Sequence, residues 1–80
     1  MSVKDAVSSR FIDLCRVRGI KVNELANLSG VTPSTVYSML DERRRDVSIT
    51  TIKKLCDGLG ITLGEFFSAP QFDALEQEIQ

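Results

Sequence analysis

Two groups of side chains that could bind a polar ligand follow each other closely in the sequence. Hydroxyl groups recur at Ser34, Thr35 and Ser38, and three arginines follow at positions 43 to 45. Hydroxyls can donate or accept hydrogen bonds, and guanidinium groups can bind and neutralise anions. The two groups together suit a surface that contacts a polar partner.

Residues for catalysis or metal binding are scarce. The sequence has no His, and no nucleophile, base and orienting residue stand in a recognisable motif. Cys15 and Cys56 are 41 positions apart and belong to no CxxC motif, so we expect two buried, reduced thiols rather than a zinc site. We predict no enzymatic activity, no cofactor and no metal.

The charge of the chain is unevenly distributed. The 80 residues carry ten Lys and Arg and eleven Asp and Glu, a net charge of −1. All ten basic residues lie in residues 1–54 with six acidic ones, whereas residues 55–80 hold five acidic residues and no basic one. This asymmetry predicts a basic working face and an acidic tail.

The length and the composition favour one small domain. Hydrophobic residues make up 42% and charged residues 26% of the chain, which is close to the average for globular proteins. No apolar run is long enough to span a membrane, and charges are scattered through the first twenty residues. We therefore expect a soluble, cytoplasmic chain without a membrane partner or an evident small-molecule ligand.

The spacing of apolar residues predicts an all-α fold. Gly19 and Gly30 are expected to end the first two helices, and Gly58 and Gly60 together the fourth, because glycine readily takes a positive φ. Thr32 is placed to cap the third helix through its hydroxyl. The expected segments are residues 3–18, 22–28, 33–40, a helix capped by Ser48 or Thr50, residues 62–67 with a Thr62 and Glu65 capping box, and an amphipathic stretch over 71–80.

The second and third predicted helices have the pattern of a helix-turn-helix unit over about residues 22–40. Ala26 is small enough for the third helix to cross over it, Gly30 permits the turn, and Val36 packs underneath. The exposed side of the helix over residues 33–40 is then free to enter the major groove of DNA.

Three separated blocks together resemble the phage Cro and repressor (Xre) family of bacterial regulators. They are ELANLSGVT at 24–32 with STVY at 34–37, TIKKLCDGLGI at 51–61, and LGEFF at 63–67. The resemblance covers roughly residues 11–67. It implies a compact five-helix, lambda-repressor-like domain that binds double-stranded DNA sequence-specifically, usually as a homodimer on a palindromic operator.

Carried over by position, the resemblance assigns contacts to residues of this chain. The family often has Gln at the start of its second helix, where this chain has Val22 followed by Asn23, and it commonly has Gly in the loop where this chain has Glu42. Lys21 or Asn23 would then supply the phosphate contact. The expected base contacts are Pro33, Ser34, Thr35, Tyr37 and Ser38, and the expected phosphate contacts are Lys21, Asn23, Thr32, Arg43, Arg44 and Arg45.

Two of these assignments have structural alternatives. The three arginines could instead lie in a solvated loop and pair with neighbouring acidic residues at positions 41, 42 and 46, since such exposed pairs are common. Tyr37 could cover the edge of the core rather than contact DNA.

The C-terminal part has two possible roles. We expect residues 1–68 to form the DNA-binding domain and residues 69–80 an acidic amphipathic helix or tail. This tail could fold back on the first helix or pair with a second chain. The expected dimer interface comprises Leu63, Phe67, Phe72, Leu75 and Ile79.

The function predicted from the sequence is a transcriptional regulator, a repressor that inserts the helix over residues 33–40 into the major groove of a palindromic operator. The alternative is a protein-interaction module, such as an antitoxin or an adaptor, built on the same helical domain.

Overall fold

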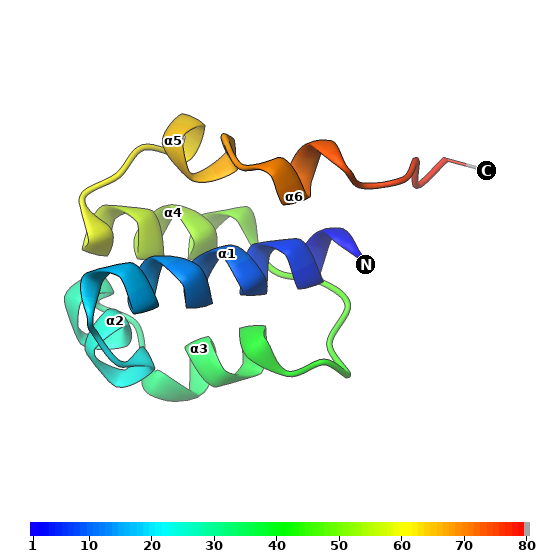
Figure 1. The fold of residues 1–80 in the computed structure, drawn as a ribbon. Helices are drawn as coiled ribbons and strands as arrows, with labels where there is room; N and C mark the ends of the chain where they lie inside the picture. Colours follow the sequence, from blue (N-terminus) through cyan, green and yellow to red (C-terminus); the bar gives the residue numbers. More distant parts are fainter. Residues whose placement is uncertain (80) are drawn as a thin grey trace.

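The computed structural model describes residues 1–79, so Gln80, the last residue of the predicted tail, lies outside the described residues. Six α-helices and no strand are present in this range, which confirms the all-α prediction. No helix within it is both long and apolar enough to cross a lipid bilayer. The helices are α1 (Val3–Arg18), α2 (Val22–Ser29), α3 (Pro33–Leu40), α4 (Ile49–Leu59), α5 (Leu63–Phe67) and α6 (Pro70–Asp73) (Figure 1).

Local capping interactions set most helix ends where the sequence predicts them. At α5 the Thr62 hydroxyl accepts a hydrogen bond from the Glu65 N–H at 3.0 Å, and the Glu65 carboxylate accepts one from the Thr62 N–H at 3.0 Å. The Ser48 hydroxyl caps α4 by accepting from the Thr50 N–H at 3.1 Å. Gly30 and Gly60 follow α2 and α4 with φ values of +68° and +70°, the left-handed conformation that ends a helix.

Gly58 does not end α4, and that prediction is wrong. It lies inside the helix, where α2 and α4 pack together. A Cβ atom at this position would lie 2.1 Å from the Ser29 hydroxyl oxygen and 2.9 Å from the Ser29 Cα atom. Glycine is needed at position 58 because two helix backbones approach each other closely, not because the chain turns.

Replacing Gly58 with Ala is expected to lower the free energy of unfolding by about 1 to 3 kcal/mol, because the helices must move apart to admit the methyl group. Urea unfolding followed by circular dichroism would measure the change. Gly64→Ala is the matched control, since a Cβ there would meet only the Thr62 hydroxyl oxygen at 3.8 Å. Equal stability of the two variants would show that the α2–α4 approach is not tight.

The core lies where the helices pack against one another. Helix α2 packs against α3 and α4, while α1 packs against α2, α3 and α6, and α5 packs against α4. In Figure 1, α5 and α6 lie on the opposite side of the molecule from α3. The buried cluster comprises Val7, Phe11, Cys15, Leu25, Ala26, Val36, Met39, Ile52, Leu55, Cys56, Leu59 and Phe66.

The first residues after α5 fold back onto the core. Ala69 is buried, and the Phe72 ring lies 5.7 Å from the Phe66 ring and 4.9 Å from the Phe67 ring, measured between centroids. Helix α6 contacts α1. This contact agrees with the alternative in which the tail folds back on the first helix. The chain beyond Asp73 is not helical up to residue 79, and Ile79 is 87% exposed.

Candidate nucleic-acid interface

Helix α3 presents one apolar and one polar face. It begins with Pro33, whose missing N–H costs nothing in the first turn of a helix. Val36 and Met39 point into the core. The predicted base contacts Pro33, Ser34, Thr35, Tyr37 and Ser38 are all exposed.

The crossing of α2 and α3 has the packing that the sequence predicts. Ala26 and Val36 are fully buried, and Gly30 takes its positive φ between the two helices. The Val31 N–H donates to the Ala26 carbonyl at 3.1 Å, which closes the turn after α2. The polar face of α3 is therefore held outward by a close helix contact beneath it.

Three hydroxyl groups gather at the N-terminus of α3. The Thr32 hydroxyl oxygen lies 3.1 Å from that of Ser34 and 2.9 Å from that of Thr35. Thr32 occupies the N-cap position, but its side chain makes no capping hydrogen bond to the backbone, contrary to the prediction. The positive end of the helix dipole and these hydroxyls together form an exposed, donor-rich surface suited to phosphate or base edges.

Two buried polar residues of α1 hold the C-terminal end of α3. Lys4 is only 2% exposed, and its Nζ donates to the Asp41 carbonyl at 2.7 Å. The Ser8 hydroxyl donates to the Met39 carbonyl at 3.0 Å. These carbonyls lack partners within the helix, and a cation is favourable at this end of the helix dipole. Helix α1 thereby positions α3 and the start of the following loop.

The sequence carried a signal for these two positioning residues that our prediction missed. Lys4 and Ser8 precede Phe11 and Cys15 at spacings of four, three and four, so all four share one face of α1. Polar residues on a core-facing stripe indicate buried hydrogen bonds.

Arg43 pairs with Asp41 rather than standing free. Its backbone N–H and Nε donate to the Asp41 Oδ1 at 3.0 and 3.1 Å, and its Nη2 donates to Oδ2 at 3.0 Å. The rest of the guanidinium faces solvent, since the side chain is 90% exposed. For Arg43, the structure thus contains the acidic partner that the alternative interpretation of the loop expected.

The hydrogen bonds from Arg43 lower the pKa of Asp41 to about 2. Because this carboxyl titrates below its unfolded value, its contribution to stability is present above about pH 4 and is lost as the pH falls toward 2. We expect the Asp41–Arg43 pair to persist unchanged from pH 8 to pH 4. An NMR titration of the Asp41 carboxyl carbon would check this, and a midpoint near the ordinary value of about 3.9 would contradict it.

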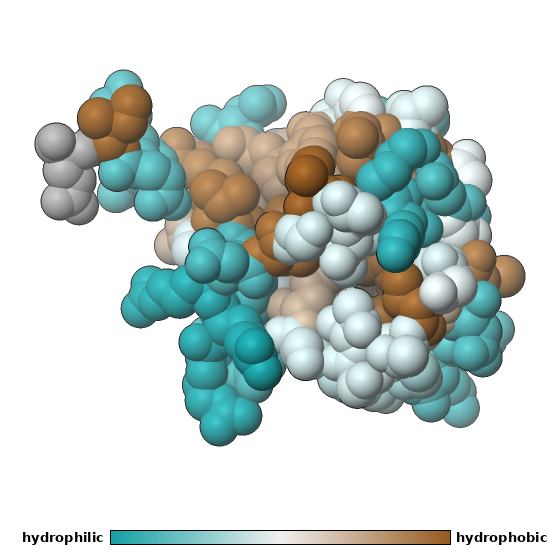
Figure 2. Space-filling view, turned by 180° about the vertical axis from the view of Figure 1, so that it is seen from behind, coloured by the Kyte–Doolittle hydropathy of each residue, from teal (hydrophilic) through white to brown (hydrophobic). Residues whose placement is uncertain are grey.

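Arg44 lies beside the polar face of α3. It lines a groove between α3 and the start of α4 together with Thr35, Ser38, Ser48 and Thr51; Met39, Asp46 and Val47 complete the lining. Neither Arg44 nor Arg45 forms an ion pair with another residue in the described part of the chain. Figure 2 shows this side of the molecule, with a surface of intermediate hydropathy next to a strongly hydrophilic projection.

The groove contains two polar residues that the sequence prediction did not include as contacts. Ser48 and Thr51 belong to the cap and the first turn of α4, directly after the basic loop. The sequence held a signal for both residues, because polar residues at the start of a helix lie next to the basic loop that directly precedes it. Lys21, Asn23, Tyr37 and Arg45 are exposed as well but do not line this groove.

The two cysteines lie away from this surface. Cys15 and Cys56 are both buried free thiols, and burial raises the pKa of each. Within residues 1–79, no three His, Cys, Asp or Glu side chains are placed to hold a metal ion together.

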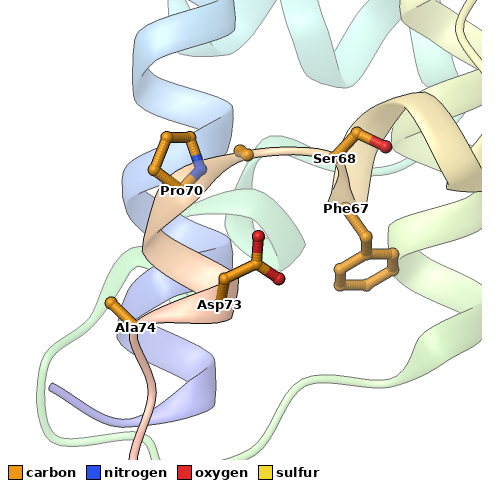
Figure 3. A pocket seen from close by; sticks show the side chains of 6 residues that line it. Phe67, Ser68, Pro70, Asp73 and Ala74 are labelled. Carbon is orange, nitrogen blue, oxygen red and sulfur yellow. The ribbon is translucent and has the colours of Figure 1, made fainter.

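The predicted dimer residues surround the opposite end of the fold. Leu63, Phe67, Phe72 and Leu75 are half-buried within their own chain, whereas Ile79 is exposed. Figure 3 shows a shallow groove between α5 and α6, with Phe67 on one side and Pro70, Asp73 and Ala74 on the other. Phe67 and Phe72 owe part of their burial to contacts with each other and with Phe66.

The all-helical fold, the close α2–α3 crossing and the exposed polar face of α3 define a helix-turn-helix DNA-binding domain. The family described as Cro/C1-type HTH DNA-binding domain matches residues 10–71, and the chain belongs to this family.

Relatives of known description share parts of this chain. The HTH-type transcriptional regulator PuuR of Escherichia coli (strain K12) is 32% identical over 66 residues, covering 82% of this chain and 35% of PuuR. The control protein C.MunI of Mycoplasma sp is 47% identical over 34 residues, covering 42% of this chain and 46% of that protein. The chain thus spans about a third of PuuR and under half of C.MunI.

A solved structure is similar over nearly the whole chain. The crystal structure of the prophage Lp1 protein 11 superimposes with a TM-score of 0.82 and 33% sequence identity, covering 94% of this chain and all of the other. The fold and the family therefore identify a helix-turn-helix DNA-binding protein related to transcriptional regulators.

Proposed function

We propose that the protein is a sequence-specific transcriptional regulator that acts as a repressor by placing α3 in the major groove of a palindromic operator. The observation that carries this proposal is the exposed polar face of α3, fixed from below by Val36 and Met39 and flanked by Arg44. A domain bound in this way excludes other proteins from the same DNA, and its place of action would be the cytoplasm, where the operator is.

Base reading would come from hydroxyl and methyl groups. Ser34, Thr35 and Ser38 can donate to or accept from several base edges, and the Thr35 methyl group can contact the methyl group of thymine. Such contacts discriminate less sharply than bidentate Arg or Gln contacts, so DNA shape would add to the specificity. Pro33 and Tyr37 lie on the same exposed helix and complete the proposed reading surface.

Phosphate contacts would surround this reading surface. Thr32 belongs to the hydroxyl cluster at the N-terminus of α3, and Lys21 and Asn23 are exposed at the N-terminus of α2. Each phosphate neutralised by a cation releases counterions and makes binding more sensitive to salt. We therefore expect affinity to fall steeply with rising salt concentration.

We propose further that the protein is a homodimer assembled through residues 63–79, with residues 1–68 as the DNA-binding domain. In Figure 1, α5 and α6 lie away from α3, which keeps the acidic charge of this segment away from the phosphates. Sedimentation of the full chain at micromolar concentration should show a dimer. A monomer both with and without DNA would rule this assembly out.

Selection of bound duplexes from a random DNA pool would test the proposed function. The expected result is two symmetric half-sites about one helical turn apart. Replacing Ser34 and Ser38 with Ala should change the selected sequence, and an unchanged sequence would contradict their role as base readers. Absence of DNA binding, with tight binding to a co-encoded protein instead, would favour a protein-interaction module.

A further inference from the structure

We propose that the arginines of the loop after α3 have separate tasks: Arg43 closes the loop on Asp41, and Arg44 binds the DNA phosphate beside α3. The inference rests on the proposed function as a DNA-binding regulator and refines it. In the sequence, positions 43 to 45 are equivalent, since three arginines stand in a row. Only their surroundings in the fold distinguish them.

Asp41 is held in place from two directions. Its carbonyl accepts hydrogen bonds from the buried Lys4 Nζ at 2.7 Å and from the Arg44 N–H at 3.0 Å. Its carboxylate accepts from Arg43 through the backbone N–H and the guanidinium. The loop is thus anchored to α1 through Lys4 and closed locally by Arg43.

The Asp41–Arg43 pair has no net charge to offer a phosphate. The bidentate pair uses the Nε and one Nη2 donor of the guanidinium, and the Asp41 carboxylate neutralises its charge. Transfer of Arg43 to DNA would leave the Asp41 carboxylate unpaired close to a phosphate of the same sign. Arg43 therefore contributes little to the attraction between the loop and the DNA backbone.

Arg44, in contrast to Arg43, carries a charge that no carboxylate neutralises within the described residues. It lines the groove with Thr35 and Ser38 of α3 and Thr51 of α4, and it forms no ion pair within the described residues, although Asp46 lines the same groove. A phosphate lying along α3 could accept from the guanidinium of Arg44 and from these neighbouring hydroxyls. The Arg44 charge is free to be neutralised by DNA.

The slope of affinity against salt concentration separates the two tasks. We would titrate the full chain against a fluorescently labelled duplex of random sequence at several salt concentrations, with Arg43→Gln, Arg44→Gln and Asp41→Asn variants. Arg44→Gln should reduce the slope of log affinity against log salt by about 0.9. Arg43→Gln should leave the slope unchanged, and Asp41→Asn should increase it by about 0.9 because Arg43 is released.

Asp13→Asn is the matched control, because it also removes the carboxylate from an exposed pair with an arginine, but on α1, outside the loop and the proposed dimer segment. It should leave the slope at the wild-type value. Circular dichroism spectra would confirm that each variant is folded. An equal reduction by Arg43→Gln and Arg44→Gln, or no increase for Asp41→Asn, would overturn the separation of tasks. Absence of salt-dependent binding by the wild-type chain would instead refute the proposed function itself.

Discussion

Replacing Phe66 with Ala is expected to lower the free energy of unfolding by about 3 to 5 kcal/mol. The Phe66 side chain is 0% exposed, and its ring lies 4.4 Å from Phe11, 4.9 Å from Phe67 and 5.7 Å from Phe72, measured between centroids. Truncation would leave a cavity where α1, α5 and α6 meet. Small domains are stable by only about 5 to 15 kcal/mol, so much of the stability depends on this ring.

Urea unfolding monitored by circular dichroism at 25 °C would measure the effect, with Phe72→Ala as the matched control. Phe72 belongs to the same aromatic cluster but is only half-buried, so its truncation should cost less. The carbonyls of Glu65 and Phe66 accept hydrogen bonds from Arg10, and these backbone contacts are unaffected by either substitution. A Phe66→Ala variant as stable as Phe72→Ala would contradict the assignment of Phe66 to the centre of the core.

The second large effect is expected for DNA binding. Replacing Thr35 with Asp should weaken affinity for the selected duplex by about 100-fold, because a carboxylate facing phosphates and base acceptors costs several kcal/mol. Thr35 lies on the exposed face of α3 and lines the groove beside Arg44. Fluorescence anisotropy at fixed salt concentration would measure the affinity.

A measurement of stability distinguishes a loss of DNA binding by Thr35→Asp from misfolding of the variant. Residue 35 is in the first turn of α3, where an acidic side chain interacts favourably with the helix dipole. Thr35→Asp should therefore unfold at an unchanged or slightly higher urea concentration while binding poorly. Val17→Asp places the same charge on α1, where the side chain of residue 17 is 84% exposed, and should bind DNA as the wild type does. Equal affinities for the two variants would show that α3 does not face the DNA.

The sequence by itself determined the helices and the helix-turn-helix. The residues that cap and end helices act within a few positions of themselves. They do so through hydrogen bonds, as at Thr62 with Glu65 and at Ser48, or through a left-handed backbone, as at Gly30 and Gly60. Apolar periodicity indicated which face of α3 is buried and which is free. Such signals are local, so they can be recognised before the arrangement of the helices is known.

Only the tertiary structure decided which side chains meet across the fold. Gly58 is required by α2, which passes close to it at Ser29, rather than by its own helix end. The buried Lys4 reaches a carbonyl 37 positions away. Arg43 and Arg44 are adjacent and chemically identical, yet one faces Asp41 and the other lines the groove beside α3. The contacts of Gly58, Lys4 and Arg44 depend on the packing of whole helix faces, which residue spacing along one segment does not encode.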